Sequence, residues 1–383
     1  MSNRSRSFDV AVVGAGVIGL AVGWRAVQRG LKVAVFERGT EPGRETSSVA
    51  AGMLAPISEA LATEQPLMRL GLASAAAYPD FVAELTEASG ADPGYLPCGT
   101  LLAARDGDEA ESLARELRLR ESLGLTAHRL RASDARQREP ALAPTLRLAL
   151  EIPDDHAIDP RKLTVALAKA LTRAGGELRL GTSVTAVSTA AGQRVTGVRL
   201  TDGTDVTADN VVVAAGPWSS ALDGLPAGAS IPVHPIKGQI LRLHDPAGPG
   251  LLTRVLRMTG GYLVPRGDGR YVLGATMEER GFDTTVTAGG VFELLRNAFE
   301  LLPSVTELVI DEISAGLRPA TPDNAPAIGA GAIPGLHWAT GHFRHGILLA
   351  PITAELVAGA LVGESGVPDE FSPTRFAGLP VAA

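Results

Sequence analysis

The sequence predicts an α/β protein with more than one domain, and three observations support this prediction. The chain has 383 residues, more than a single hydrophobic core usually contains. Short, continuously apolar segments such as Val10–Val13 and Val211–Ala214 are typical of strands buried on both faces of a sheet. Amphipathic stretches with a helical period, such as Leu163–Ala174, lie between them. Helices that alternate with buried strands indicate a parallel sheet covered by helices.

The overall composition is that of a globular protein, and it excludes several functional classes. Hydrophobic residues make up 45% of the chain and charged residues 20%. A formal charge of −7, without a local run of basic residues, argues against a nucleic-acid partner. The single cysteine, Cys98, excludes an internal disulfide framework and is typical of a reducing cytoplasm.

The N-terminus resembles a secretion signal in part, because a basic start precedes the apolar run Val10–Gly23. Asp9 introduces this run, however, and Trp24–Arg25 stand where a small-residue cleavage site would lie. No apolar segment reaches the about 18–20 charge-free residues that a membrane span needs. We therefore expect a cytoplasmic protein without a membrane partner.

The first forty residues predict a strand, a tight turn, a helix and a second strand. Gly14, Gly16 and Gly19 have the G-x-G-x-x-G spacing. In this pattern the first glycine permits the turn, the second lets a pyrophosphate approach the backbone, and the third lets the helix pack on the strand. We expect the helix over Ala15–Arg29 and the second strand over Lys32–Phe36. This arrangement is that of a Rossmann-like domain.

Glu37 ends the second strand, 23 positions after Gly14, where a carboxylate can accept hydrogen bonds from an adenosine ribose. Glycine spacing alone is weak evidence in a chain with 44 glycines. The strand, the helix and the acidic residue together make the prediction of a dinucleotide site specific. Glu37 would repel a 2′-phosphate, which disfavours NADP, and these residues leave FAD and NAD as alternatives.

The next segment, GRETSSVAAGMLAPISE at 43–59, contains two kinds of candidate ligand. A cation and hydroxyl groups suited to a pyrophosphate are supplied by Arg44, Thr46, Ser47 and Ser48. Small residues, against which a flat ring can lie, are Ala50, Ala51 and Gly52. The same composition is also that of a flexible polar loop.

Six segments, in this order and spacing, resemble the D-amino acid oxidase superfamily, and most closely its glycine oxidases of thiamine biosynthesis (ThiO type). They are SSVAAGMLAP at 47–56, VVVAAGPWS at 211–219, PIKGQILRL at 235–243, GYLVPRGDGRYVLGATME at 261–278, SAGLRPATPDNAPAIG at 314–329 and ATGHFRHGILLAPITAEL at 339–356. The resemblance covers the chain from end to end.

The resemblance implies a Rossmann-like FAD-binding domain of the glutathione-reductase type, joined to a second, α+β substrate domain built on an antiparallel sheet. The FAD-binding domain is expected to be discontinuous, over residues 1–94, 153–228 and 318–383. The substrate or lid domain would then take residues 95–152 and 229–317. FAD is expected to be non-covalent, because Cys98 lies far in sequence from where some relatives attach flavin.

The glycine turn and the resemblance together imply a large set of cofactor contacts. The expected residues are Gly14, Gly16, Val17, Ile18, Gly19, Glu37, Arg38, Arg44, Thr46, Ser47, Ser48, Ala50, Ala51, Gly52, Met53, Val184, Ala215, Gly216, Trp218, Arg318, His342, Phe343, Arg344, His345, Gly346, Ile347 and Leu348. Trp218 is equally plausible as a core residue.

An oxidase of a small amino acid must hold the substrate carboxylate, and arginine does so best because its fork makes two parallel hydrogen bonds. Arg318 is the candidate, between a short predicted strand and Pro319, and the resemblance implies this role for it. The alternative is a surface arginine beside a turn. Tyr262 would supply a second donor to the carboxylate, the alternative being an aromatic residue packed in the sheet.

Met53 and Met277 would form the walls of a small pocket, although either could be a core methionine. Arg344 would lie near the reactive face of the flavin and help to orient the substrate. His342 and His345 are three residues apart, with no carboxylate near them in the sequence. We therefore expect no metal site and no general-base role for them.

Gly341–Gly346 is expected to be a strand-to-helix turn. Free backbone amides of Gly346, Ile347 and Leu348 at the helix start would face flavin N1 and O2, where negative charge gathers on reduction.

The expected activity is an FAD-dependent oxidase of glycine, and of other small amines such as sarcosine or small D-amino acids. Glycine would become iminoacetate, O₂ would become H₂O₂, and the imine would feed formation of the thiamine thiazole or hydrolyse to glyoxylate and ammonia. The alternatives are a D-amino acid or sarcosine oxidase or dehydrogenase of the same superfamily, and a flavin-binding module without turnover. We expect a homo-oligomer, since relatives are commonly oligomeric.

Overall fold

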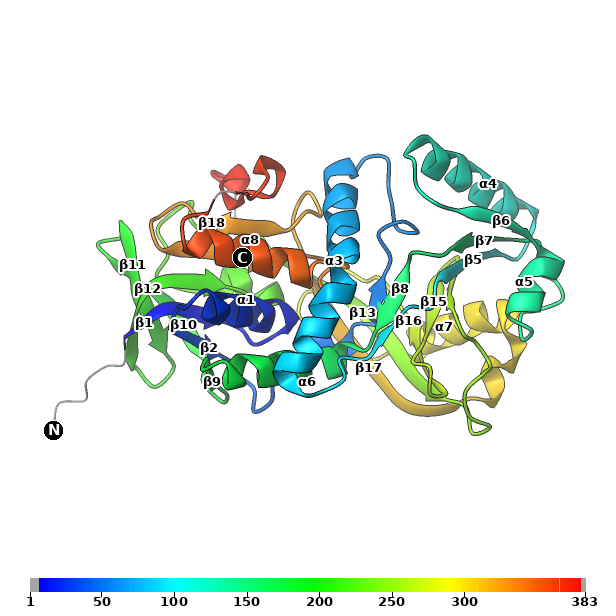
Figure 1. Ribbon diagram of the computed structural model, residues 1–383, viewed down its shortest axis with the longest axis horizontal. Helices are drawn as coiled ribbons and strands as arrows, with labels where there is room; N and C mark the ends of the chain where they lie inside the picture. Colours follow the sequence, from blue (N-terminus) through cyan, green and yellow to red (C-terminus); the bar gives the residue numbers. More distant parts are fainter. Residues whose placement is uncertain (1–6, 365, 380–383) are drawn as a thin grey trace.

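Two large sheets and one small sheet organise the protein along its long axis (Figure 1). The computed structural model describes residues 7–364 and 366–379, so that Met1–Arg6, within the basic start of the chain, lie outside the described residues. No helix among the described residues is long and apolar enough to cross a membrane.

The first sheet contains the predicted Rossmann-like unit. Its strands are β1 (Phe8–Val13), β2 (Val33–Phe36), β9 (Glu177–Arg179), β10 (Val184–Ala190), β11 (Arg194–Leu200), β12 (Asp205–Val213), β18 (Ala327–Ala330) and β19 (Leu336–Thr340). Strands β19, β12, β1, β2 and β9 are parallel neighbours in this order. β11 and β12 form an antiparallel hairpin with Asp202–Gly203 in its turn.

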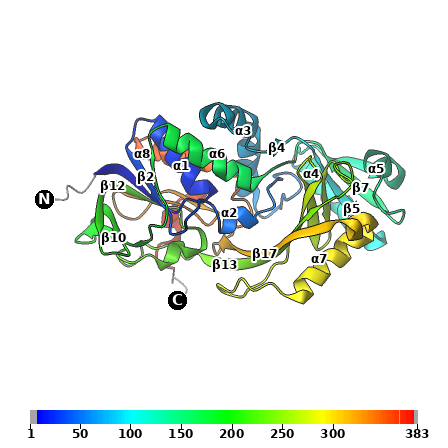
Figure 2. The ribbon, with the colours of Figure 1, turned by 90° about the horizontal axis from the view of Figure 1, so that it is seen from below.

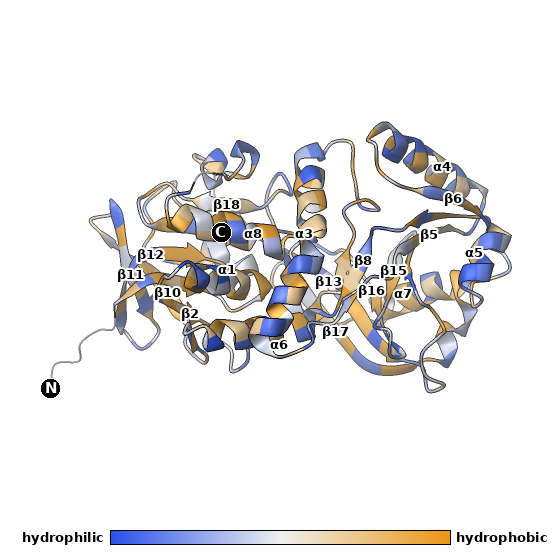
Figure 3. Cartoon of the chain, viewed as in Figure 1, coloured by the Kyte–Doolittle hydropathy of each residue, from blue (hydrophilic) through white to orange (hydrophobic). Residues whose placement is uncertain are grey.

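Three helices cover one face of this sheet, namely α1 (Val17–Gln28), α6 (Pro160–Arg173) and α8 (Ala350–Leu361), and α3 (Gln65–Ser89) packs on α6 and α8. Figure 2 shows α8, α1 and α6 side by side. Leu20, Leu167 and Val357 are fully buried between these helices and the sheet. On the opposite face, Trp338 and Phe376 belong to a second buried cluster. Burial on both faces explains why these strands are continuously apolar (Figure 3).

The second large sheet has the order β17-β13-β16-β15-β14-β5-β7-β6. Its strands are β5 (Thr100–Ala104), β6 (His128–Arg131), β7 (Leu148–Ile152), β13 (His234–His244), β14 (Val255–Met258), β15 (Gly261–Pro265), β16 (Arg270–Gly274) and β17 (Val309–Ala320). The helices attached to it are α4 (Gly107–Ser122), α5 (Ala132–Arg138) and α7 (Ala288–Leu301). The predicted antiparallel sheet is confirmed, with one parallel pairing, that of β14 with β5.

The third sheet is small and has the order β3-β8-β4. It consists of β3 (Met53–Leu54), β4 (Tyr95–Leu96) and β8 (His156–Ile158). The remaining elements are α2 (Thr46–Val49), η1 (Gly216–Ala221), η2 (Pro303–Glu307), η3 (Asp369–Phe371) and η4 (Pro373–Phe376).

The structure differs from the predicted elements at several ends. Helix α1 begins at Val17, because Gly14–Gly16 form the turn before it. The strand expected to end before Pro319 is longer, since β17 continues through Pro319 to Ala320. β17 pairs with β13 alone and is an edge strand, where a proline is tolerated because its missing N–H costs no ladder hydrogen bond.

Candidate functional site

A cavity of about 940 Å³ lies between the first and second sheets. It begins at the carboxyl ends of β1, β2 and β12, where Gly14, Glu37 and Ala214 line it. It continues to Tyr262 and Met277 beside the second sheet. Ligands of open parallel sheets bind at this edge, outside the carboxyl ends of the strands.

The turn at Gly14–Gly16 allows a ligand to approach its backbone closely. Gly14 has φ +104°, and its amide donates to Phe36 O at 2.8 Å. A Cβ on Gly14 would lie 2.6 Å from Ala214 O, so a side chain has no room there. The N-terminus of α1 follows directly, and the Val17 amide donates to Ser47 Oγ at 3.0 Å. A helix N-terminus of this kind favours an anionic group such as a pyrophosphate.

Glu37 supports this turn as well as lining the cavity. Its carboxylate accepts hydrogen bonds from the amides of Ala15, at 2.9 Å, and Gly39, at 2.9 Å. A carboxylate has further lone pairs, so Glu37 retains acceptors for a ribose hydroxyl. Beyond it, the Arg38 guanidinium lies 3.8 Å from the centre of the Trp218 ring.

The hydroxyl-rich segment after Gly43 forms the short helix α2, and its side chains divide into two groups. Thr46 donates to Leu317 O at 2.7 Å, and Thr46 and Ser47 line the cavity. Ser48 turns back to Arg44 O, at 2.5 Å, and does not line the cavity. Arg44 borders the cavity, but its side chain is exposed and pairs with Glu41.

Arginines from other elements hold the backbone of the predicted flavin-contacting segment. Arg242 on β13 and Arg161 on α6 both donate to Ser48 O, at 2.5 and 3.2 Å. Arg266, after β15, donates to Ala51 O at 2.8 Å, and burial lowers the pKa of Arg266 to about 10. These bonds hold the small residues in one conformation against the cavity.

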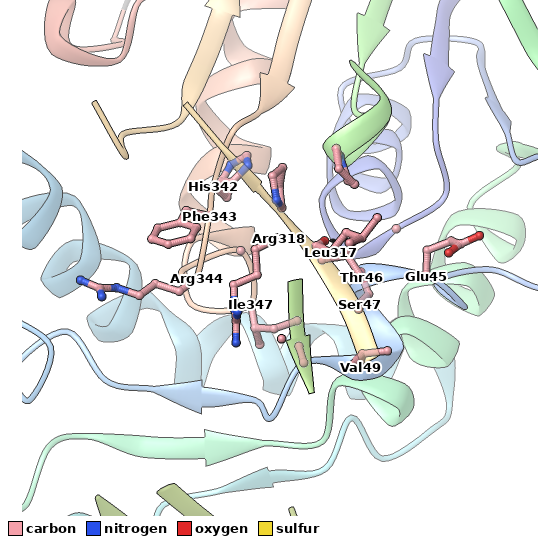
Figure 4. A pocket seen from close by; sticks show the side chains of 18 of the residues that line it. Glu45, Thr46, Ser47, Val49, Leu317, Arg318, His342, Phe343, Arg344 and Ile347 are labelled. Carbon is pink, nitrogen blue, oxygen red and sulfur yellow. Dashed lines mark hydrogen bonds between the residues drawn. The ribbon is translucent and has the colours of Figure 1, made fainter. Parts of the chain in front are cut away.

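Arg318 is the central cation of the cavity. It lies on β17, opposite Ile236, and its Nη1 donates to Thr276 O at 3.2 Å. A Cβ on Gly238 would lie within 2.6 Å of the guanidinium, so this glycine makes room for Arg318. No carboxylate of the described chain lies within 4 Å of the guanidinium. In Figure 4 Arg318 lies beside Ile347, and the Thr46–Val49 segment lies to the right of both.

Tyr262 faces the same part of the cavity from β15. Burial raises the pKa of its phenol, and the positive charge of Arg318 opposes that rise. A phenol with a raised pKa stays protonated and can donate a hydrogen bond. Met53 and Met277 also line the cavity, and Met277 is 63% exposed, which places it at the open side.

Glu59 is a residue of this site that the sequence reasoning missed. Its carboxylate lies 3.5 Å from Arg257, 3.7 Å from Arg344 and 3.6 Å from His345 Nδ1. Burial alone would raise the pKa of Glu59, but Arg257, His345 and Arg344 lower it overall. Although no carboxylate stands near His345 in the sequence, Glu59 therefore lies beside it in the fold.

The charges of this region leave one cation unpaired. Arg344 lies 3.8 Å from Glu64 as well as close to Glu59, and Arg257 pairs with Glu59. Two carboxylates therefore balance two arginines, which leaves Arg318. Figure 4 shows the Arg344 side chain directed away from Arg318, so that its guanidinium is occupied by the glutamates.

The loop that carries Glu59 is held by two buried charged groups. Asp155 accepts hydrogen bonds from the amides of Ile57, at 3.0 Å, and Ser58, at 2.6 Å, and burial raises the pKa of Asp155 to about 6. Arg120, also buried, donates to Ile57 O and Ser58 O at 3.1 and 2.7 Å. This support depends on residues about 60 and 100 positions away along the chain, which sequence periodicity does not reveal.

The turn after β19 brings a second backbone segment to the cavity. His342 is buried, its Nε2 lies 3.0 Å from Thr353 Oγ1, and burial lowers its pKa to about 3. The prediction that Gly346, Ile347 and Leu348 start the helix is wrong, because α8 begins at Ala350. Their amides lie in the preceding turn and donate to no acceptor in the described chain, whereas the Leu349 amide donates to His345 O.

The structure brings most of the predicted site residues to one cavity. Three predicted cofactor contacts do not line it, namely Gly19, Ser48 and Leu348. Gly19 packs against Gly14, and the Leu348 carbonyl accepts from Ser74 inside the helical layer. Cys98 does not line it either. Among the described residues, no group of three or more His, Cys, Asp or Glu side chains is suited to a metal ion.

Arg257 is a second residue that the sequence did not predict, and the register of the β14–β15 hairpin could have revealed it. Arg257 on β14 pairs directly with Tyr262 on β15. Once Tyr262 is a candidate, its cross-strand partner becomes a candidate too.

The cavity and its lining fit FAD. One end has the glycine turn, a helix N-terminus and Glu37, and the other has free amides beside an unpaired arginine and a phenol. The fold and the site therefore define a flavin-dependent oxidoreductase.

Comparison with known proteins identifies the family. Residues 9–360 match the family model described as FAD dependent oxidoreductase (DAO), and the chain belongs to this family. It is 37% identical over 375 residues to the glycine oxidase of Geobacillus kaustophilus, covering 97% of this chain and 98% of that protein. The crystal structure of glycine oxidase from Geobacillus kaustophilus superposes with a TM-score of 0.90 at 36% identity, covering 97% of this chain and 100% of that one.

A second relative is longer than this chain. The bifunctional protein ThiO/ThiG of Synechocystis sp. is 37% identical over 375 residues, which is 96% of this chain and 54% of that protein. The chain thus corresponds to about half of the bifunctional relative.

Proposed function

We propose that this protein is an oxidase that converts glycine to iminoacetate and O₂ to H₂O₂. The observation that carries the proposal is the unpaired Arg318 guanidinium, which faces the cavity beside Tyr262 in a chain of the FAD dependent oxidoreductase family. The similarity to glycine oxidases over nearly the whole chain supports glycine as the substrate.

The chain's own residues would bind and orient the substrate. Arg318 would hold both carboxylate oxygens through its fork, and the Tyr262 hydroxyl would donate a further hydrogen bond. Met53 and Met277 would restrict the space around the α-carbon, which favours a substrate without a large side chain. When bound, FAD would supply the two-electron redox chemistry that couples oxidation of the amine to reduction of O₂.

Two backbone regions would hold the cofactor. The Gly14 turn and the N-terminus of α1 would bind the pyrophosphate, with Glu37 on the ribose. The free amides of Gly346 and Ile347 would help to hold the flavin and stabilise the negative charge that it gains on reduction. We infer that FAD is held without a covalent bond, because Cys98 does not line the cavity.

We also propose that the chain divides into an FAD-binding domain of residues 1–94, 153–228 and 318–383 and a substrate domain of residues 95–152 and 229–317. The origin of the strands supports this division. The first sheet uses strands from 8–36, 177–213 and 327–340, and the second uses strands from 100–152 and 234–320. β17 crosses the last boundary by three residues.

The proposal also covers the fate of iminoacetate, the oligomeric state of the protein and its localisation. Iminoacetate would serve formation of the thiamine thiazole, which the likeness to the ThiO/ThiG protein supports. We infer that the protein is cytoplasmic and forms a homo-oligomer. Light scattering after gel filtration tests the oligomeric state.

A steady-state panel with peroxide detection tests the proposed substrate. Glycine, sarcosine, D-alanine and D-proline are compared by kcat/KM, with H₂O₂ formed in proportion to substrate consumed. A methyl group changes pocket affinity by only about 1–3 kcal/mol, so sarcosine and D-alanine are expected to react more slowly rather than not at all. Turnover without peroxide, or a preference for D-proline over glycine, would contradict the proposal.

A further inference from the structure

The segment Ala275–Thr287, between β16 and α7, has no helix or extended strand. Thr276, Met277 and Glu278 at its start and Thr287 at its end line the cavity. In Figure 2 the coil that leads into α7 extends from that helix past β13 toward the first sheet. The segment belongs by sequence to the second sheet, yet its Phe282 contacts Trp218 in η1, which follows β12 of the first sheet.

Two buried side chains of β13 fix this segment. Lys237 is only 1% exposed, and its Nζ lies 3.5 Å from Glu278 and 3.6 Å from Asp283. Gln239, fully buried, donates to Glu278 Oε1 at 2.7 Å and accepts from the Thr287 amide at 2.9 Å. A buried ammonium group is costly without an opposite charge, so Lys237 favours the one conformation in which both carboxylates reach it.

The tip of the segment contacts the opposite side of the cavity. The Phe282 ring stacks on Trp218, with centroids 6.0 Å apart and an interplanar angle of 27°. Trp218 lies on η1, directly after β12, and the same indole is covered by the Arg38 guanidinium at 3.8 Å. Phe282 remains 53% exposed and does not line the cavity, so its role is not to fill a core.

The position of Trp218 indicates which part of the cavity the contact between Phe282 and Trp218 would cover. Trp218 and Arg38 line the cavity next to Glu37, which is the end where the adenosine half of FAD is expected. Met277, at the other end of the segment, lies at the substrate side. The segment therefore runs from the Met277 side of the cavity to Trp218.

We propose that Ala275–Thr287 is a clasp that retains FAD, with Lys237 and Gln239 as its anchor and the stacking of Phe282 on Trp218 as its closure. FAD leaves only after this contact opens. Phe282 acts through Trp218 and is a positioning residue for cofactor retention. The clasp concerns the cofactor and does not depend on which amine is oxidised.

The direct test is the rate of FAD release from the purified holoenzyme. Holoenzyme is diluted, and the rise of flavin fluorescence gives the dissociation rate. Phe282→Ala is expected to release FAD about tenfold faster, since an aromatic pair contributes about that factor to a contact. Phe282→Tyr keeps the stacked ring and is expected to restore the wild-type rate.

Phe292→Ala is the matched control. Phe292 lies on α7, next to the clasp in sequence, and is 65% exposed. Its loss is expected to leave FAD release unchanged. The proposal is overturned if Phe282→Ala releases FAD at the wild-type rate, or if Phe292→Ala accelerates release equally.

Lys237→Met tests the anchor separately. Methionine preserves most of the buried volume but removes the charge that holds Glu278 and Asp283, so faster FAD release is expected. The double variant with Phe282→Ala should release FAD no faster than the quicker single variant, because both changes open the same segment. Rates that multiply in the double variant would show two independent effects and contradict a single clasp. If Lys237→Met does not fold, the Phe282 series alone decides.

Discussion

At the scale of single residues, the site depends on Arg318 remaining unpaired. Its neighbours Arg257 and Arg344 pair with Glu59 and Glu64, so that among the described residues Arg318 is the cation of this region that we propose for the substrate carboxylate. Arg318 itself is held by backbone carbonyls of Lys237 and Thr276. Carbonyl groups orient the guanidinium without cancelling its charge.

Arg318→Ala is therefore expected to raise the KM for glycine by about 10²–10³-fold, because a charge-assisted carboxylate contact of this kind is lost. FAD should remain bound, as measured by the flavin absorbance of the purified variant. Arg115→Ala, on the exposed surface of α4, serves as the control and should have wild-type kinetics. An unchanged KM in Arg318→Ala would remove this residue from the substrate site.

Gly238 allows a subtler test of the same guanidinium. A methyl group at Gly238 would lie within 2.6 Å of it, and the far end of a long side chain can move aside. Gly238→Ala is thus expected to displace Arg318 with little loss of stability and to lower kcat/KM for glycine about 10–100-fold. Gly289→Ala, where no atom lies within 4 Å of the new methyl group, is the control. Equal kinetics for the two variants would argue against this placement of Arg318.

His337 links stability to pH. It is buried on β19, its Nδ1 has no partner in the described chain, and burial lowers its pKa to about 4. The unfolded chain binds a proton below its ordinary pKa, 6.5, whereas the folded chain does not until about 4. Its contribution to stability is therefore present above pH 6.5 and is lost as pH falls toward 4.

His337→Leu should reduce the loss of stability between pH 7 and pH 5 by on the order of 1–2 kcal/mol. The free energy of unfolding in urea at the two pH values measures this difference. A variant whose stability falls with pH as steeply as that of the wild type would show that His337 does not titrate as described.

At the scale of elements, the turn between β1 and α1 combines a required backbone conformation with a lack of space. Gly14 and Gly30 both have positive φ, +104° and +84°. A Cβ at Gly14 would meet the Ala214 backbone, whereas at Gly30 nothing lies within 4 Å. The Ala214 backbone cannot move aside for a new methyl group as the end of a long side chain can.

Gly14→Ala is expected to cost about 2–5 kcal/mol of folding free energy and to weaken FAD binding, because strain and overpacking add. Gly30→Ala should cost only the conformational term, about 1–2 kcal/mol. Urea unfolding and the retained flavin content distinguish the two variants. Similar losses in both would mean that the turn has more room than the structure shows.

At the scale of the whole molecule, local patterns predicted the strands and helices well, and contacts between distant segments could not be predicted. The continuously apolar run Val10–Val13 predicts a buried strand, and the helical period of Leu163–Ala174 predicts a helix. Glu59 acquires its role only because Arg257 and Arg344 arrive from other parts of the chain. The start of α8 at Ala350 was missed because a turn with free amides precedes it.

The parallel pairing of β14 with β5 belongs to the same scale. Their residues are about 150 positions apart and are brought together by the fold of the second sheet. The pattern of apolar and polar residues within a strand does not determine which strand pairs with it. The resemblance to a family predicted most residues of the site. The ion pairs that neutralise Arg257 and Arg344 were found only in the structure.

The most direct test of the central claim is the flavin absorbance of the purified protein after anaerobic mixing with glycine. Glycine is expected to bleach the yellow oxidised flavin, and O₂ is expected to restore it with one H₂O₂ per flavin. A flavin that stays oxidised with glycine, sarcosine and small D-amino acids alike would contradict the account.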